Sequence, residues 1–269
     1  MPLRLCILIL FVSKSCLAQL VWQKIDSGLS ILEVPSPKKS EYGTNTITIV
    51  KIDPRYYNFE MINATAIDSA QRTAAGWCRE QNLLAAVNAG MFSLDDKITN
   101  TGYLRNYDHV NNAKWNPRYN MVLAFHPKAA GIPPIQLIDM LCDDWPALLE
   151  KYNTYVQGLR IVDCRKQIVW EKSAKRWSMV LWGMDSQGNV LWCFTRSPYP
   201  VTDFSQILQK LQIGLTKLMY LEGGPEASLF LRHPNKNLLL MGSYETGFRE
   251  DDHNQVFWNI PNVIGIRRK

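Results

Sequence analysis

Hydrophobic and polar residues follow each other in short runs along this chain. Segments rich in Ile, Val, Thr and aromatic residues are separated by polar turns, several of which contain Pro, and this pattern is typical of strands joined by turns. We expect strands at residues 30–34, 46–52, 57–62, 83–87, 121–125, 135–138, 161–170, 178–184, 190–195 and 217–221. The turn Asp185-Ser186-Gln187-Gly188-Asn189 predicts a hairpin between 178–184 and 190–195.

Two segments have a helical pattern instead. Residues 69–81 form one of them, and the second contains apolar residues at a spacing of about 3.6: Phe204, Ile207, Leu208, Leu211 and Leu215. Asp203 would cap this second helix, with Gln206 completing a capping box. Residues 95–120 are polar and have no clear period, so we expect a long ordered loop with a functional role. Hairpins with isolated helices favour the α+β class, as a single domain with a mainly antiparallel or mixed sheet.

The first residues have the pattern of a secretory signal peptide. A basic start at Arg4, an apolar run over 5–12 and the small residues before Gln19 fit its three regions. We expect cleavage after Ala18, which leaves one domain at residues 19–269; lipidation of Cys16 is a less favoured alternative. No later stretch resembles a transmembrane helix. The sequence therefore predicts a secreted or periplasmic protein without stable membrane insertion.

Charge and cysteine content add little about partners. Without Arg4 and Lys14 the 30 basic residues become 28, against 24 acidic ones, a net charge of +4. No basic stripe with interleaved aromatic residues is present, so we expect no nucleic-acid partner. The four later cysteines would allow two disulfides in three pairings in an oxidising compartment, or would be small buried side chains: Cys78, Cys142, Cys164 and Cys193.

Familiar catalytic motifs are missing, but two strand ends are unusual. The sequence has no HExxH, GxSxG or Walker motif, and its four histidines are scattered. At residues 87–90 and 221–224 an apolar strand ends in a polar residue, Asn88 or Glu222, followed by glycine. Glycine lets a ligand approach the main chain, and burial at such a place raises the pKa of a carboxyl group. A plain Asx turn at Asn88, and a turn residue or structural ion pair at Glu222, are the alternatives.

Several segments together resemble a known family. NAGMF at 88–92 and LEGGPEASL at 221–229 resemble the two signature segments of the phosphodiester glycosidase family. Further similar segments follow in the same order, so that the resemblance extends over about residues 29–266: TITIVKIDP at 46–54, QGLRIV at 157–162 and WSMVLWGMDSQGNVLW at 177–192. The resemblance implies hydrolysis of a sugar-1-phosphate diester at the anomeric C–O or the P–O bond.

The resemblance also implies a set of site residues. They are Asn88, Gly90 and Gly102, the pair Gln157 and Arg160, and the acidic element Glu222, Gly223 and Gly224. The family usually has Asp where this chain has Glu222, which is longer by a C–C bond of about 1.5 Å. Because Pro-Glu-Ala precedes Ser228, the serine's match is open.

Chemistry suggests roles for these residues. The fork of Arg160 would hold the phosphodiester charge, with help from Arg196 or Arg176. Glu222 would be a general acid or base, paired with Glu226 or Asp95. Alternatively, carboxylates would hold a divalent cation against the phosphate. The function expected is a secreted hydrolase that cleaves sugar-1-phosphate diester linkages in glycans or envelope polymers. The alternative is a non-catalytic envelope glycan-binding module, related to exopolysaccharide or the cell wall.

Overall fold

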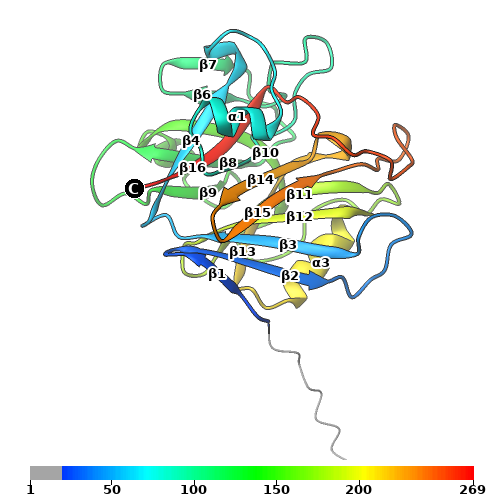
Figure 1. Ribbon diagram of the computed structural model, residues 1–269. Coiled ribbons are helices and arrows are strands. Elements are labelled where there is room, and N and C mark those ends of the chain that lie inside the picture. The colour runs from blue at the N-terminus through cyan, green and yellow to red at the C-terminus, as the bar shows by residue number, and fades with distance from the viewer. Residues whose placement is uncertain (1–19) are drawn as a thin grey trace, which may run out of the picture.

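The computed structural model describes residues 20–269, so the expected signal peptide lies outside the described residues. Two β-sheets pack face to face (Figure 1). The larger has eleven strands, with β1-β2-β3-β12-β11-β13-β10-β6-β7 in order and β8 and β9 attached beside β10. The smaller has five, in the order β15-β14-β5-β16-β4. Every pairing between these strands is antiparallel, which confirms the expected α+β fold with its mainly antiparallel sheets.

The strands of the large sheet are β1 Gln23–Asp26, β2 Leu29–Pro35, β3 Thr46–Ile52, β6 Leu104–Asn106, β7 His109–Asn112, β8 Met121–Pro127, β9 Ile135–Asp139, β10 Tyr152–Val162, β11 Trp177–Asp185, β12 Val190–Tyr199 and β13 Leu215–Gly223. Those of the small sheet are β4 Tyr57–Asn63, β5 Ala85–Asn88, β14 Ser228–His233, β15 Lys236–Met241 and β16 Asn262–Arg268. The helices are α1 Ala74–Glu80, α2 Trp145–Leu149 and α3 Val201–Lys210, with 3-10 turns η1 Ala64–Ala66 and η2 Gly224–Glu226.

The core is layered. The largest apolar cluster lies between the two sheets and contains residues such as Val50, Trp192 and Val87. A second cluster joins the outer face of the large sheet to α3, and a third joins the outer face of the small sheet to α1. Period-two alternation along the strands explains this arrangement, because successive side chains point to opposite faces.

The central strand β13 is irregular near its end. Leu181 of β11 pairs with Tyr220 and Val180 pairs with Glu222, so Leu221 has no partner on β11. Such a bulge re-aims the side chains beside it and is common next to functional sites. Here it precedes Glu222 and the two glycines that follow.

Four local predictions were wrong. The expected loop at 95–120 contains β6 and β7, whose few residues are too short to show a period. The strand expected at 161–170 lies earlier, as β10. Its buried polar residues Thr154 and Gln157, which bond to the neighbouring segment 106–119, interrupt the apolar pattern. The helix expected at 69–81 begins at Ala74, after the Thr73 cap. Asp203 is not a cap: Pro200 precedes α3 as N-cap residue, and Asp203 pairs with Lys38.

One disulfide is present among residues 20–269. Cys142 and Cys164 are bonded and join the turns that follow β9 and β10. Cys78 and Cys193 are free and buried, in agreement with the alternative that some cysteines are buried side chains. No helix in the described part of the chain is long and apolar enough to cross a bilayer.

Candidate active site

Three glutamates gather where β13 ends. Glu222 is the second-last residue of β13, Glu226 closes the turn η2, and Glu245 lies in the segment after β15. All three are partly accessible to solvent. None of them forms a salt bridge with another group of residues 20–269 under a 4.0 Å limit. Three neighbouring carboxyl groups without a salt bridge are unusual, because like charges destabilise one another at short range.

Burial raises the pKa of all three carboxyl groups, and repulsion by neighbouring glutamates adds to the shift at Glu222 and Glu226. The pKa of Glu222 lies well above its usual value because of burial and the nearby Glu226. Burial, with a contribution from Glu245, raises the pKa of Glu226 to about 7. The pKa of Glu245 is also raised by burial, and Lys175 opposes the shift. The protonated form of each of these carboxyl groups is therefore favoured, and Glu226 is close to half ionised at neutral pH.

The two glycines after Glu222 allow this crowding. A Cβ on Gly223 would collide with the Tyr220 hydroxyl and the Trp177 ring. A Cβ on Gly224 would collide with the Glu245 carboxylate, and Gly224 has a φ of 65°, which disfavours other residues. The glycines thus let three side chains approach the main chain at the strand end.

Asn88 holds the turn that carries Glu226. Its Oδ1 accepts a hydrogen bond of 2.7 Å from the Ser228 N–H, and its Nδ2 donates one of 2.9 Å to the Glu226 carbonyl. The Ser228 hydroxyl donates to the same carbonyl at 2.9 Å. Asn88 and Ser228 are fully buried. The structure thus joins the ends of β5 and β13, the two segments singled out from the sequence, through contacts to the backbone.

Gln157 holds the polar loop against the same end of the sheet. Its Oε1 accepts from the backbone N–H groups of Tyr103 and Asn116 at 3.0 and 2.9 Å. Its Nε2 donates to the carbonyls of Asn116 and Tyr119 at 2.9 and 2.7 Å. Tyr119 lies near Glu222, whose charge, after burial itself, raises the pKa of the tyrosine. Gln157 is buried, so it positions the loop and does not itself face solvent.

The other two glycines expected in the site pack against loop side chains. Gly90 has a φ of 107°, and a Cβ there would lie 3.0 Å from the Asn100 Oδ1. A Cβ on Gly102 would lie 2.8 Å from the Tyr119 ring and 2.9 Å from the Gln157 carbonyl. Both positions keep the loop close to the sheet.

Arg160 occupies a separate pocket beside the cluster. Its Nη1 donates to both carboxylate oxygens of the buried Asp139, at 2.9 and 3.2 Å. Arg160 also lines a pocket of about 380 Å³, together with Arg118, Trp170 and Glu171. The Trp170 ring is 5.5 Å from that of Tyr220, which in turn lies over Gly223. An aromatic path therefore connects the arginine pocket to the carboxylates.

Arg196 has mainly structural contacts. It donates to the Asp252 carboxylate at 2.7 Å and to the carbonyls of Met241, Asp252 and Asn254. Arg176 packs over two tyrosine rings. Asp95 is exposed in its loop. Of the two carboxylates considered as partners of Glu222, the structure therefore places Glu226 near it and not Asp95.

Sequence reasoning missed Glu245, Tyr119 and Tyr220. Glu245 lies in no strand pattern. It is positioned by an isolated β-bridge to Trp177, which joins distant parts of the chain. Tyr119 lies in an aperiodic loop, and Tyr220 reads as an ordinary core residue of a strand. Only the fold brings these side chains together.

The glutamates do not form a ready metal cage. Among residues 20–269, three ligand-type side chains come within 4.8 Å of one another in one place, which is Asp139 with Cys142 and Cys164. Those cysteines form the disulfide and Asp139 is paired with Arg160, so that group does not offer free ligands. Carboxylate oxygens remain suitable donors for a divalent cation if the glutamate side chains move.

Comparison with known proteins identifies the family of the chain. The model of the phosphodiester glycosidase family matches residues 81–267, which is most of the chain. No protein of curated function matches the sequence. Among solved structures, a hypothetical protein from Synechocystis is similar with a TM-score of 0.62 and 12% identity, over 93% of this chain and 64% of that one. This chain thus spans less than two thirds of that protein.

The catalytic domain of the zebrafish N-acetylglucosamine-1-phosphodiester alpha-N-acetylglucosaminidase, described as auto-inhibited by its pro-peptide, is similar with a TM-score of 0.57 and 12% identity, over 93% of this chain and 82% of that one. At such identity the two likenesses concern the fold. The family match includes both segments that meet at the carboxylates. On that ground, the chain belongs to the phosphodiester glycosidase family.

Proposed function

We propose that this protein hydrolyses sugar-1-phosphate diester linkages in glycans or envelope polymers. The observation that carries the proposal is the group of three glutamates at the end of β13, which have raised pKa values and form no salt bridge within residues 20–269. Carboxyl groups whose pKa values are raised toward neutrality are suited to general acid–base catalysis.

Raised pKa values suit these carboxyl groups to an anionic substrate. A phosphodiester carries one negative charge, and three ionised carboxylates would repel it. The raised pKa of Glu222 favours its protonated form, which adds no such repulsion and can donate a hydrogen bond to a sugar or phosphate oxygen. Glu226, with its pKa of about 7, changes its charge in the range where a base must accept a proton.

The reaction then needs one proton transfer from water. Glu226 accepts a proton as the water oxygen bonds to the anomeric carbon, and the bond between that carbon and the bridging oxygen breaks. The electron pair of the broken bond stays on the phosphate, which leaves as a monoester. The products are the free sugar and the phosphomonoester. Attack at phosphorus, which breaks the P–O bond, gives the sugar and the monoester as well, with the water oxygen on the phosphate.

The pocket at Arg160 is the proposed site for the phosphate. Asp139, fully buried, holds the Nη1 group of the guanidinium, and Arg160 also lines the pocket. Arg118 lines the same space and adds a second positive charge, while Glu171 in the lining carries a negative one. Guanidinium groups bind phosphate oxygens in a fork geometry, so the two arginines suit a phosphodiester.

Export and the role of a metal also remain proposals. The disulfide between Cys142 and Cys164 supports an oxidising compartment, such as the periplasm or the cell exterior. Envelope polymers would be the substrates there. A divalent cation held by the glutamates stays open as an alternative way to stabilise the phosphate charge.

The test is sugar release from an N-acetylglucosamine-1-phosphate methyl diester, chosen because the name of the zebrafish enzyme specifies such a linkage. We expect wild-type turnover, and a loss of at least about a hundredfold in Glu226→Gln and Glu222→Gln. Glu150→Gln, at an exposed carboxylate, is the matched control and keeps full activity. Parallel assays with EDTA decide the metal alternative.

Hydrolysis in ¹⁸O-labelled water shows whether the C–O or the P–O bond breaks. Label in the sugar indicates C–O cleavage, and label in the phosphate indicates P–O cleavage. Binding of this diester and of larger glycan phosphodiesters without any turnover, in wild type and variants alike, would contradict the hydrolase and favour the glycan-binding module.

A further inference from the structure

Tyr220 lies between the arginine pocket and the glutamates. It pairs with Leu159 of β10, which lines the arginine pocket together with Trp170. The Trp170 ring is 5.5 Å from the Tyr220 ring, and the Trp177 ring lies edge-on to it at 6.3 Å. These aromatic and apolar neighbours fix the ring of Tyr220, which is only 5% exposed.

The hydroxyl group of Tyr220 lies at the glutamate end of this ring. A Cβ on Gly223 would be 2.2 Å from the Tyr220 hydroxyl oxygen and 2.8 Å from the Trp177 indole nitrogen, so both polar atoms lie against the main chain next to Glu222. Burial, followed by the charges of the three glutamates, raises the pKa of Tyr220 well above its usual value. Tyr220 therefore keeps its proton and remains a hydrogen-bond donor.

Two donors at this place have no partner in the protein. The Trp177 indole N–H is buried without a hydrogen bond to any group of residues 20–269. The Tyr220 hydroxyl also bonds to no protein group in that range, but its oxygen is not sealed from solvent. Because an indole N–H can only donate, the phenol proton of Tyr220 is directed away from it and is free to bond to an acceptor from outside the protein.

The proposed reaction creates such an acceptor. Attack at the anomeric carbon leaves the electron pair of the broken C–O bond on the oxygen that bridges sugar and phosphorus. Attack at phosphorus leaves the pair of the broken P–O bond on the same oxygen. Negative charge therefore develops there by either course, and a donor at an atom where charge develops stabilises the transition state more than the bound substrate.

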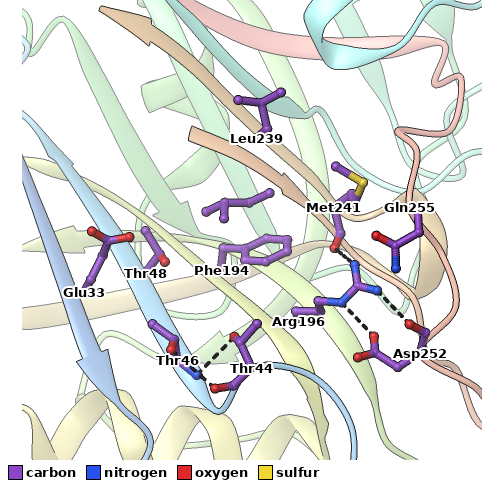
Figure 2. A pocket seen from close by; sticks show the side chains of 11 residues that line it. Glu33, Thr44, Thr46, Thr48, Phe194, Arg196, Leu239, Met241, Asp252 and Gln255 are labelled. Carbon is purple, nitrogen blue, oxygen red and sulfur yellow. Dashed lines mark hydrogen bonds and ion pairs between the residues drawn. The ribbon is translucent and has the colours of Figure 1, made fainter. Parts of the chain in front are cut away.

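The arginines are engaged elsewhere. Arg196 donates to Asp252 and to three backbone carbonyls beside a separate cavity (Figure 2). Arg160 lines the pocket proposed for the phosphate, where it would bind the nonbridging oxygens. Tyr220 lies between that pocket and Glu222, which is the place of the bond between phosphate and sugar in the proposed substrate.

We propose that Tyr220 is a catalytic residue whose hydroxyl donates a hydrogen bond to the oxygen that bridges sugar and phosphorus. The proton stays on the phenol throughout, and the hydrogen bond strengthens as charge develops on the bridging oxygen. Glu226 remains the base, so the bonds made and broken are those of the reaction described above. This inference rests on the proposed hydrolase function and adds to it the group that stabilises the leaving oxygen.

The first test is Tyr220→Phe, which removes the hydroxyl and keeps the ring. With the N-acetylglucosamine-1-phosphate methyl diester we expect kcat to fall by about a hundred- to a thousandfold while KM changes by less than about threefold, because the donor acts mainly in the transition state. The urea midpoint should equal that of wild type, since the hydroxyl bonds to no protein group.

Tyr152→Phe is the matched control. It removes the hydroxyl of another buried tyrosine, which donates to the Pro133 carbonyl at 2.9 Å. This variant should lose stability, because a hydrogen bond is removed, and should keep the kcat of wild type.

A second measurement locates the hydrogen bond on the substrate. In the phosphonate analogue of the diester a CH₂ group replaces the bridging oxygen, so the analogue offers Tyr220 no acceptor there. Wild type and Tyr220→Phe should therefore bind the phosphonate with equal affinity in isothermal titration calorimetry.

The proposal is overturned if Tyr220→Phe turns over the diester like wild type, or if it binds the phosphonate more weakly, since the hydroxyl would then bond to another atom. A loss of kcat together with a loss of stability as large as that of Tyr152→Phe would indicate a structural role and would also overturn it. Absence of turnover in wild type refutes the hydrolase function itself, which distinguishes the two failures.

Discussion

The carboxyl group of Glu226 changes its charge near neutral pH, and this has a consequence for stability. Its pKa is raised from 4.5 to about 7 in the folded protein. The folded state therefore holds a proton between these values that the unfolded state has lost. Stability falls as pH rises from about 4.5 to 7, and then levels off.

We expect Glu226→Gln to remove part of this pH dependence. The variant should be more stable than wild type at pH 8 by about 1–3 kcal/mol and similar at pH 4, because glutamine is neutral at both. Urea unfolding at several pH values measures the difference. Equal pH profiles for variant and wild type would show that the raised pKa is absent.

Asn88 gives a second prediction at the level of single residues. Asn88→Ala removes two buried hydrogen bonds that hold the turn of Glu226. The expected loss of stability is about 2–4 kcal/mol, because the Ser228 N–H and the Glu226 carbonyl lose their partner. Asn58→Ala, at an exposed asparagine of β4, is the control for the same change and should have little effect on the urea midpoint.

The sequence predicted parts of the site unevenly at this scale. Asn88 and Glu222 were visible because each ends an apolar strand before glycine, a pattern that a short stretch contains in full. Their roles differ. Both hydrogen-bonding groups of the Asn88 amide bond to the backbone, while Glu222 has no salt bridge and accepts one hydrogen bond, from the Gly223 N–H. Glu245 was invisible, since its place depends on a bridge to Trp177 that sequence spacing does not encode.

At the scale of elements, the disulfide fastens the turns after β9 and β10 near Asp139. The Asp139 carboxylate accepts from the Cys164 N–H and pairs with Arg160, so the disulfide lies beside the arginine anchor. We expect Cys142→Ala with Cys164→Ala to lose about 3 kcal/mol of stability, since the bond closes a loop of 22 residues.

Thermal or urea unfolding of the double variant measures this loss. Cys78→Ala, at a free buried cysteine, keeps the disulfide and serves as the comparison. Reduction of the disulfide should therefore still lower the stability of this variant. If wild type and the double variant unfold alike under non-reducing conditions, the disulfide does not contribute.

Elements were predictable where the pattern was long and local. The hairpin of β11 and β12 has nine and ten residues with a polar turn between them, and it was found. The strands β6 and β7, with three and four residues, are stabilised by pairing with β10 and each other and not by their own sequence. The expected helix cap at Asp203 was wrong because Asp203 pairs with Lys38 instead.

At the scale of the whole molecule, the arrangement of two sheets was not predictable beyond its class. Neighbours in the large sheet, such as β3 and β12, are more than a hundred residues apart in sequence, and no local pattern specifies which strands pair. A cavity lined by Thr48 of β3 and Phe194 of β12 depends on these same pairings.

The position of β5 also affects how the protein folds. β5 lies between β14 and β16, so the strand that carries Asn88 gains both neighbours from residues 228–268. Contacts of such large sequence separation form slowly, because a long loop must close first. The glutamate cluster is thus expected to assemble late, and a folding intermediate that lacks the small sheet would be inactive even with β13 in place.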